Sequence, residues 1–285
     1  YIQVKPALAG RMLFLNDSAT TTLIKRITMI KADQPTCFPA AVSVAVSSKQ
    51  DGQMQRGKAE SNEEVNKNRQ RFLKQSGIKN STIALVNIRY GNDYSYDVIT
   101  TIASKEDIDN LGRLTRSASD CIMTNQPNVT LFLPIADCVA TAIYDPVNNV
   151  AALAHLGRHS SVAKLASKVV KQMNDQFQSK PEDLIVWMAP SIRPPHYAIA
   201  RADFAENDTD WGNYCTKIKN GYSLDLSGYN RQLFIAAGVP AHQIIMSDVN
   251  TATDKNYWSH FTAVTKNNLP EPPRFAVAAM ISDKI

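Results

Sequence analysis

Short apolar runs separated by turn-forming segments dominate the middle of the chain. Residues 129–135, 139–144 and 150–155 are such runs, and residues 145–149 (Asp-Pro-Val-Asn-Asn) separate the last two. Runs that are apolar throughout are typical of strands covered on both faces. A hairpin between the runs 139–144 and 150–155 would bring the residues just before position 139 beside the end of the run 150–155.

Other segments are rich in β-branched and aromatic residues or end at turn-forming residues. We therefore predict further strands over residues 38–46, 81–89, 94–103, 184–188 and 275–281. The residue types at 91–93 (Gly-Asn-Asp) favour a turn between two of them.

The spacing of apolar residues changes to a helical period after His155. Apolar side chains from Val162 to Phe177 recur at intervals of three and four residues, which predicts an amphipathic helix capped by Ser160 or Ser161. A second helix is expected over residues 226–238, with Gly238 at its end. A third is expected from a capping box at 61–64 to about residue 75.

This mixture of strands and helices indicates the α+β class, in one domain spanning residues 1–285. Residues 1–37 form a weakly patterned N-terminal segment. Residues 47–61 are polar and contain two glycines, so we predict an exposed loop there.

Composition narrows the functional classes. The chain has 285 residues, of which 44% are hydrophobic and 20% charged, as in an ordinary globular protein. The net charge is +5, but the basic residues are scattered. A small cluster at 67–71 (Lys-Asn-Arg-Gln-Arg) is therefore interpreted as a solvated helix face, and no nucleic-acid partner is expected.

We also expect no membrane partner and a cytoplasmic location. No segment approaches the roughly 20 apolar residues that span a bilayer, and the N-terminal residues lack the pattern of a signal peptide. The four cysteines are few and far apart, which predicts reduced thiols rather than a disulfide scaffold.

The strongest chemical signal is the pair Cys138 and His155. Cys138 lies at the edge of one apolar run and His155 at the end of the next. A thiol and an imidazole brought together by a hairpin suit a metal site or a Cys/His nucleophile. Taken singly, each residue is more often structural, as a buried thiol or a hydrogen-bonded histidine.

Three stretches in this order resemble the YfiH, or laccase-domain, family. The first joins residues 119–127 (Ser-Asp-Cys-Ile-Met-Thr-Asn-Gln-Pro) to the Ala-Asp-Cys at 136–138 and the Tyr-Asp-Pro at 144–146. The second is His-Leu-Gly at 155–157. The third is Ala-Pro-Ser-Ile at 189–192, followed by Leu-Asp-Leu, Asn-Arg and Ala-Ala-Gly-Val downstream. The resemblance covers roughly residues 38–282.

The resemblance implies a layered α/β sandwich of mixed sheets flanked by helices, related to the catalytic domain of cytotoxic necrotizing factor. Family members have been labelled multicopper polyphenol oxidases and later described as purine nucleoside phosphorylases with adenosine deaminase side activity. The family's metal site contains two histidines and one cysteine. Cys138 and His155 match one of each, which implies a zinc site with an open position for water or substrate.

The chain departs from the family pattern at the other metal ligand. Where the family has Gln-Val-His-Gly, residues 88–91 read Ile-Arg-Tyr-Gly, so Tyr90 occupies the position of the histidine, or Asn87 in a shifted alignment. The third ligand therefore stays open between His159 and His196. We do not expect copper, because five histidines without a His-X-His pair cannot supply the usual copper ligands.

These motifs define the candidate site. Cys138, His155 and Arg158 are the expected catalytic residues. Arg158 lies near the start of the predicted helix, where a phosphate is stabilised, although serine capping alone explains the position equally well. The expected substrate-binding residues are Tyr90, Asp137, His159 and His196, and for Asp137 a purely structural hydrogen-bonding role is equally expected.

Three functions follow from this comparison. The first is purine nucleoside phosphorolysis, with a purine nucleoside and phosphate as the small-molecule partners. The second is a catalytically degenerate homologue that binds a nucleoside or a protein. The third is a metal-free Cys/His hydrolase or deamidase with Cys138 as the nucleophile and His155 as the base.

Overall fold

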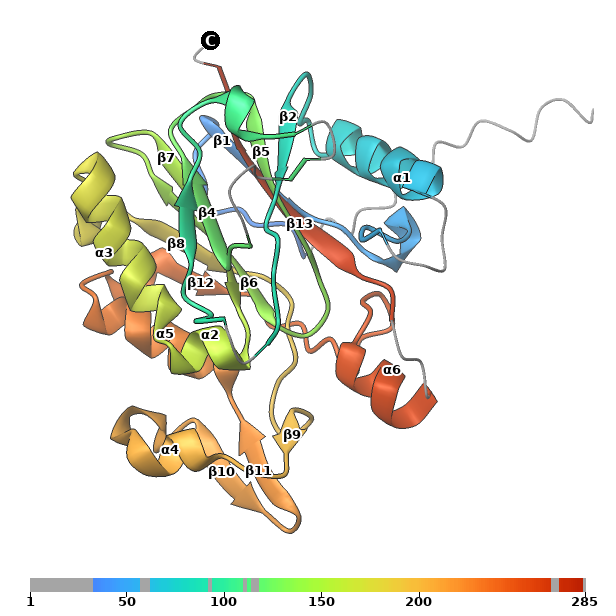
Figure 1. The fold of residues 1–285 in the computed structure, drawn as a ribbon, viewed down its shortest axis with the longest axis vertical. Helices are drawn as coiled ribbons and strands as arrows, with labels where there is room; N and C mark the ends of the chain where they lie inside the picture. Colours follow the sequence, from blue (N-terminus) through green and yellow to red (C-terminus); the bar gives the residue numbers. More distant parts are fainter. Residues whose placement is uncertain are drawn as a thin grey trace, which may run out of the picture.

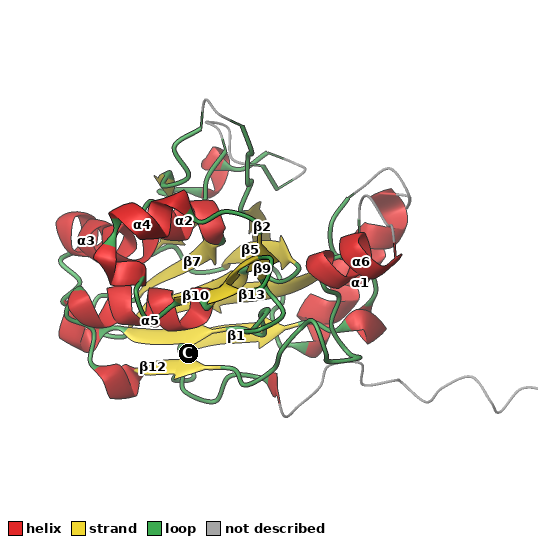
Figure 2. Cartoon of the chain, turned by 90° about the horizontal axis from the view of Figure 1, so that it is seen from below, coloured by secondary structure: helices red, strands yellow, loops and turns green. Residues whose placement is uncertain are grey.

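The computed structural model describes residues 33–56, 62–91, 94–109, 112–113, 118–267 and 272–283. A four-stranded sheet with the order β1-β13-β5-β2 packs against a six-stranded sheet with the order β12-β8-β6-β7-β4-β3. A third sheet, β10-β11-β9, forms a small extension. Helices α3 and α5 lie on one side of the two large sheets and α1 on the other, as Figures 1 and 2 show.

The strands have the following bounds: β1 Val42–Val46, β2 Thr82–Leu85, β3 Ile99–Thr101, β4 Cys121–Thr124, β5 Val129–Ile135, β6 Val139–Asp145, β7 Val150–Leu156, β8 Ile185–Met188, β9 Ala198–Ile199, β10 Cys215–Ile218, β11 Gly221–Leu224, β12 Ile244–Met246 and β13 Phe275–Ile281. The helices are α1 Asn62–Gln75, α2 Arg158–Val162, α3 Leu165–Phe177, α4 Asp203–Asn207, α5 Leu226–Ala236 and α6 His260–Asn267.

Three apolar clusters hold these layers together. The first fills the space between the two large sheets, with Leu131 and Val277 on one side and Leu153 on the other. A second joins the outer face of the six-stranded sheet to α3 and α5, and a third joins the four-stranded sheet to α1. The central strands are therefore covered on both faces, and the predicted layered α/β sandwich of the α+β class is confirmed.

The predicted central strands are confirmed almost to the residue. Strands β5 and β13 have the predicted bounds, and β6 and β7 are one residue longer than predicted. Strands β6 and β7 form the expected antiparallel hairpin, with Ala140 opposite His155. The strands predicted over residues 38–46, 81–89 and 94–103 are shorter than expected, since only β1, β2 and β3 within them are strands.

The helix after His155 differs from the prediction. It begins at Arg158 with Gly157 as its N-cap, and it is interrupted at Lys164, whose φ of 56° lies in the left-handed region. Ser160 and Ser161 lie inside α2 and do not cap a helix that starts after them. Both hydroxyls donate to the Gly157 carbonyl, and Ser160 also donates to that of His155, which anchors the short first helix.

The prediction of an exposed loop over residues 47–61 is wrong for its first half. Ser47, Ser48, Asp51 and Met54 are buried. The backbone N–H and the hydroxyl of Ser48 donate to the Asp51 carboxylate, so the polar groups are satisfied inside the protein. The capping serine predicted at position 61 and the segment 1–32 lie outside the described residues.

All four cysteines are free thiols, as predicted. Among the described residues, none of the helices is long and apolar enough to cross a membrane.

Candidate active site

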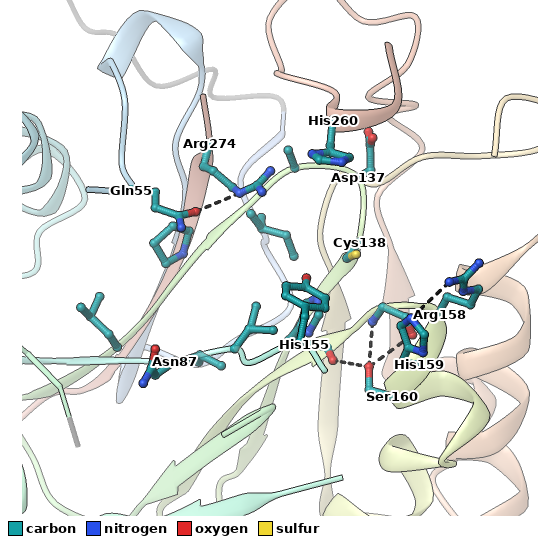
Figure 3. A pocket seen from close by; sticks show the side chains of 18 of the residues that line it. Gln55, Asn87, Asp137, Cys138, His155, Arg158, His159, Ser160, His260 and Arg274 are labelled. Atoms are coloured by element: carbon teal, nitrogen blue, oxygen red, sulfur yellow. Dashed lines mark hydrogen bonds between the residues drawn. The ribbon is translucent and has the colours of Figure 1, made fainter. Parts of the chain in front are cut away.

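The β6–β7 hairpin brings Cys138 and His155 to the same end of the six-stranded sheet. Cys138 immediately precedes β6, and His155 lies near the end of β7. Since Ala140 is opposite His155 and Val139 is opposite Leu156, the antiparallel register carries Cys138 toward Gly157. Figure 3 shows the sulfur and the imidazole on the same side of the pocket.

Gly157 has no side chain, and this leaves a space that the Cys138 sulfur and the His155 imidazole share. A Cβ atom at this position would lie 3.0 Å from Nε2 of His155 and 3.1 Å from Sγ of Cys138. Both reactive atoms therefore face one small volume, which any larger residue at position 157 would fill.

Asp120 holds the other nitrogen of the imidazole. Oδ1 of Asp120 lies 3.2 Å from Nδ1 of His155, and the His155 backbone N–H donates to the Asp120 carbonyl at 2.7 Å. Both side chains are buried. Burial alone lowers the pKa of His155, but the Cys138 sulfur and the Asp120 carboxylate act in the opposite direction and raise it to about 9. His155 is therefore protonated near pH 7 and places a cation beside Cys138.

These residues open into a cavity of about 920 Å³, within the usual range for small-molecule sites. Its wall combines apolar residues of β2 and β5 with polar residues from the ends of other elements. Five arginines contribute to the lining, namely Arg56, Arg69, Arg113, Arg158 and Arg274. An anionic or strongly polar ligand fits this lining.

Four of the predicted residues line the cavity beside the central pair, namely Tyr90, Asp137, Arg158 and His159. The ring of His159 stacks on Tyr96 with centroids 4.5 Å apart, and its Nε2 lies 3.1 Å from the Arg158 guanidinium. Burial and the Arg158 charge lower the pKa of His159.

His196 and Asp137 have different surroundings. His196 is not part of the cavity wall, and its Nδ1 lies 3.0 Å from the side-chain nitrogen of Asn250. Asp137 borders the cavity, but its carboxylate accepts from the Thr251 and Ser259 hydroxyls and from the Phe261 backbone N–H. These bonds tie the β5–β6 turn to the start of α6, which is a structural role.

The sequence did not single out Asp120, which contacts His155, nor Tyr197 and the arginines at 56, 69 and 274, which line the cavity. Asp120 is a charged residue directly before a buried strand, which is a usable signal. Arg69 belongs to the cluster 67–71, which we interpreted as solvated, yet only 5% of this residue is exposed. The helical spacing alone did not distinguish Arg69 from its exposed neighbours.

The side chains present do not fit the metal site that the resemblance implies. Cys138 and His155 share one space, but His159 is stacked on Tyr96 and tied to Arg158, while His196 is outside the cavity. In the described part of the chain, no group of three or more His, Cys, Asp or Glu side chains is arranged to hold a metal ion. Two ligands are fewer than a catalytic zinc site uses.

The Asp120–His155 contact predicts a pH-dependent stability. Since the folded-state pKa of His155 is raised from 6.5 to about 9, its charged form stabilises the fold fully below about pH 6.5, and this contribution is lost as the pH rises through about 9. Urea unfolding between pH 6 and 9.5 should show this loss in the native protein. Asp120→Asn should weaken this pH dependence of stability because it lowers the pKa of His155. His155→Gln should remove the pH dependence. Equal pH dependence in all three proteins would contradict the contact.

Gly157→Ala tests the shared space. The added methyl group would crowd both the sulfur and the imidazole, so we expect alkylation of Cys138 by iodoacetamide to slow by about tenfold or more. Gly212→Ala is the matched control, because its new Cβ would approach only the Thr209 carbonyl. Unchanged alkylation in Gly157→Ala would show that the two groups do not share this space.

Proteins of known sequence resemble this chain over about half their length. A protein named purine nucleoside phosphorylase YlmD, from Bacillus subtilis, is 32% identical over 156 residues, which are 50% of this chain and 53% of that protein. A protein named adenosine deaminase RL5, from an unknown prokaryotic organism, is 29% identical over 136 residues, 45% of this chain and 50% of that protein. The chain thus spans about half the length of these curated relatives.

Solved structures share the whole fold. The crystal structure of YlmD from Geobacillus stearothermophilus matches with a TM-score of 0.73 and 21% identity, covering 87% of this chain and 94% of that one. The hypothetical protein YfiH from Bacillus licheniformis matches with a TM-score of 0.72 and 23% identity, covering 85% and 93%. The family model described as multi-copper polyphenol oxidoreductase laccase matches residues 42–267. The chain therefore belongs to this family, the YfiH or laccase-domain family that its motifs resemble.

Proposed function

We propose that this protein is a cytoplasmic purine nucleoside phosphorylase-like enzyme that acts on adenosine or inosine in the cavity at Cys138 and His155. The single observation that carries the proposal is the buried His155, which lies between Cys138 and Asp120 at the wall of a cavity of nucleoside size. The names of several relatives support the same substrate class.

The site's residues suit the chemistry of phosphorolysis. A phosphate oxygen forms a bond to C1′ of the ribose while the bond from C1′ to the base nitrogen breaks, and the bonding pair leaves with the base. The protonated His155 is placed to give its proton to the departing purine, and the phosphate becomes ribose 1-phosphate. The Cys138 sulfur would lie beside the ribosyl centre on which positive charge develops, and Arg158 is the expected partner of an anionic substrate group.

The test is product analysis with inosine and adenosine, each with and without inorganic phosphate. We expect hypoxanthine or adenine to appear together with an equal amount of ribose 1-phosphate, only when phosphate is present. Arg158→Gln should raise the KM for phosphate more than that for inosine. Nucleoside binding without any product would favour a degenerate homologue.

The Asp120 contact favours one other candidate function. Enzymes with a cysteine nucleophile commonly place a histidine beside the thiol and an aspartate beside the histidine. The aspartate orients the histidine, and the histidine activates the thiol. Cys138 would then attack C6 of adenosine, ammonia would leave with a proton from His155, and water would release inosine from the enzyme. Ammonia release from adenosine without phosphate, together with alkylation of Cys138 that depends on His155, would support this deamidase-like reaction over phosphorolysis.

A further inference from the structure

Three arginines from separate parts of the chain meet at the cavity wall. Arg56 follows the short 3-10 helix η2 (Lys49–Asp51), Arg69 lies in α1, and Arg274 immediately precedes β13. In Figure 3 the labelled Arg274 and Arg158 lie on opposite sides of Cys138. Arg274 is hydrogen-bonded to Gln55, the neighbour of Arg56 in the chain, and the charge of Arg56 acts on Arg69, so these three arginines form one group.

Arg69 is fixed in place by the protein interior. It is 5% exposed, its Nε donates to the Met54 carbonyl at 2.7 Å, and its guanidinium lies 5.2 Å from the centre of the Phe132 ring. The loop that we expected to be exposed thus supplies the carbonyl that orients this cation. A side chain held this firmly loses little freedom when it binds a ligand.

The other two arginines are held by neutral groups. Arg56 donates from Nη2 to Oδ1 of Asn66 at 2.8 Å, and its buried Nε has no hydrogen-bond partner. Arg274 donates from Nε to Oε1 of Gln55 at 2.9 Å. Within the described ranges, none of the three guanidinium groups forms an ion pair with a carboxylate.

The charges of this group are therefore not compensated by the protein. Burial, followed by the nearby Arg56 charge, lowers the pKa of Arg69 to about 10, which still leaves it protonated near neutral pH. Asp137 borders the same cavity, but three donors already occupy its carboxylate. Arg69 is buried, whereas Arg56 and Arg274 are partly exposed, and a buried positive charge beside other positive charges is costly unless an anion joins them.

We propose that Arg56, Arg69 and Arg274 form an anion subsite that binds a phosphate group. Arginine matches phosphate because its planar fork presents paired N–H donors to two oxygens. For its role in the reaction the proposal rests on the proposed function. The group is either the inorganic phosphate that attacks the ribose or the 5′-phosphate of a nucleotide substrate.

Calorimetric titration tests the subsite without requiring turnover. The native protein is titrated separately with inorganic phosphate, adenosine and adenosine 5′-monophosphate. We expect Arg56→Gln and Arg274→Gln each to weaken phosphate binding by about tenfold or more while adenosine binding stays within about twofold. Lys67→Gln is the matched control, since it removes one positive charge from the exposed side of α1 and should change nothing.

The outcomes separate the two sources of the phosphate group. If inorganic phosphate alone binds and depends on the arginines, the subsite holds the attacking phosphate. If inorganic phosphate does not bind, but adenosine 5′-monophosphate binds more tightly than adenosine, the subsite holds the phosphate of a nucleotide. In that case the arginine variants should bind adenosine 5′-monophosphate no more tightly than adenosine. The proposal is overturned if the native protein binds neither anion, or if only Arg158→Gln weakens their binding. Thermal unfolding of each variant checks its fold, and Arg274→Lys, which keeps the charge, should retain part of the affinity.

These results are independent of the proposed function. Phosphate binding that depends on the three arginines, without any base release, would leave the subsite in place and refute phosphorolysis. Base release from inosine that is unaffected in Arg56→Gln and Arg274→Gln, together with unchanged binding of phosphate and of adenosine 5′-monophosphate, would refute the subsite and leave phosphorolysis in place.

Discussion

Cys138→Ala is expected to abolish the turnover of purine nucleosides, with a loss of about 10³-fold in kcat/KM. The sulfur is the group that faces His155 across the space left by Gly157, and it contributes to raising the pKa of that histidine. Removing it takes away the sulfur beside the reacting centre in phosphorolysis and the nucleophile in the deamidase-like reaction. Both candidate chemistries therefore require it.

The fold should tolerate this change. Cys138 is only half-buried and lies outside the strand ladders, so we expect Cys138→Ala to lower the free energy of unfolding by less than about 1 kcal/mol. Cys215→Ala removes a second half-buried thiol, which lies in the small sheet and does not line the cavity, and it should retain full activity. If Cys138→Ala turned over inosine at the native rate, the site would lie elsewhere.

Asp137→Ala is expected to have the largest effect on stability, a loss of about 3–5 kcal/mol in the free energy of unfolding. The buried carboxylate accepts from Thr251, Ser259 and Phe261, and its removal leaves these donors without an acceptor. The φ of 78° at this position adds backbone strain for alanine, whereas aspartate and asparagine tolerate it better.

Urea unfolding measures this effect directly. Asp137→Asn keeps one acceptor and a residue suited to the left-handed region, so it should lose less than the alanine variant. Glu182→Ala changes an exposed carboxylate and should stay within about 0.5 kcal/mol of the native protein. A loss below 1 kcal/mol in Asp137→Ala would mean that the link between the β5–β6 turn and α6 does not stabilise the fold.

The central strands were predictable because they are covered on both faces and their sequences are apolar throughout. Strands β5, β6, β7 and β13 follow that rule. The start of α2 was not predictable, because its N-cap is Gly157. Ser160 and Ser161, the residue types that signal a cap, lie inside the helix and bond to backbone carbonyls. Local patterns predict which segments are helical, but they do not distinguish a capping serine from one that bonds back to a carbonyl.

The candidate site was predictable only in part. Neighbouring strands bring Cys138 and His155 together, so their proximity followed from the hairpin. Asp120 reaches His155, and the arginines reach the cavity, through contacts between segments that are distant in the sequence. Arg69 and Met54, for example, are joined across fifteen residues by a bond between α1 and a loop. Such contacts depend on tertiary packing and leave no periodic signal.

The family description and the side chains of this site point to different chemistry. The matching family is described as a multi-copper oxidoreductase, whereas the described residues offer a thiol, a protonated imidazole and several arginines. These groups favour proton transfer and anion binding near a polar substrate. Cys138, His155 and Asp120 therefore supply the reactive groups of the site, and the arginines supply its positive charge.

The most direct test of this account is a crystal structure of Cys138→Ala with inosine and inorganic phosphate. We predict that inosine occupies the cavity with its purine ring near His155 and its ribose near position 138. A structure in which inosine at millimolar concentration binds outside this cavity, or does not bind at all, would contradict the central claim that the Cys138–His155 cavity is a nucleoside site.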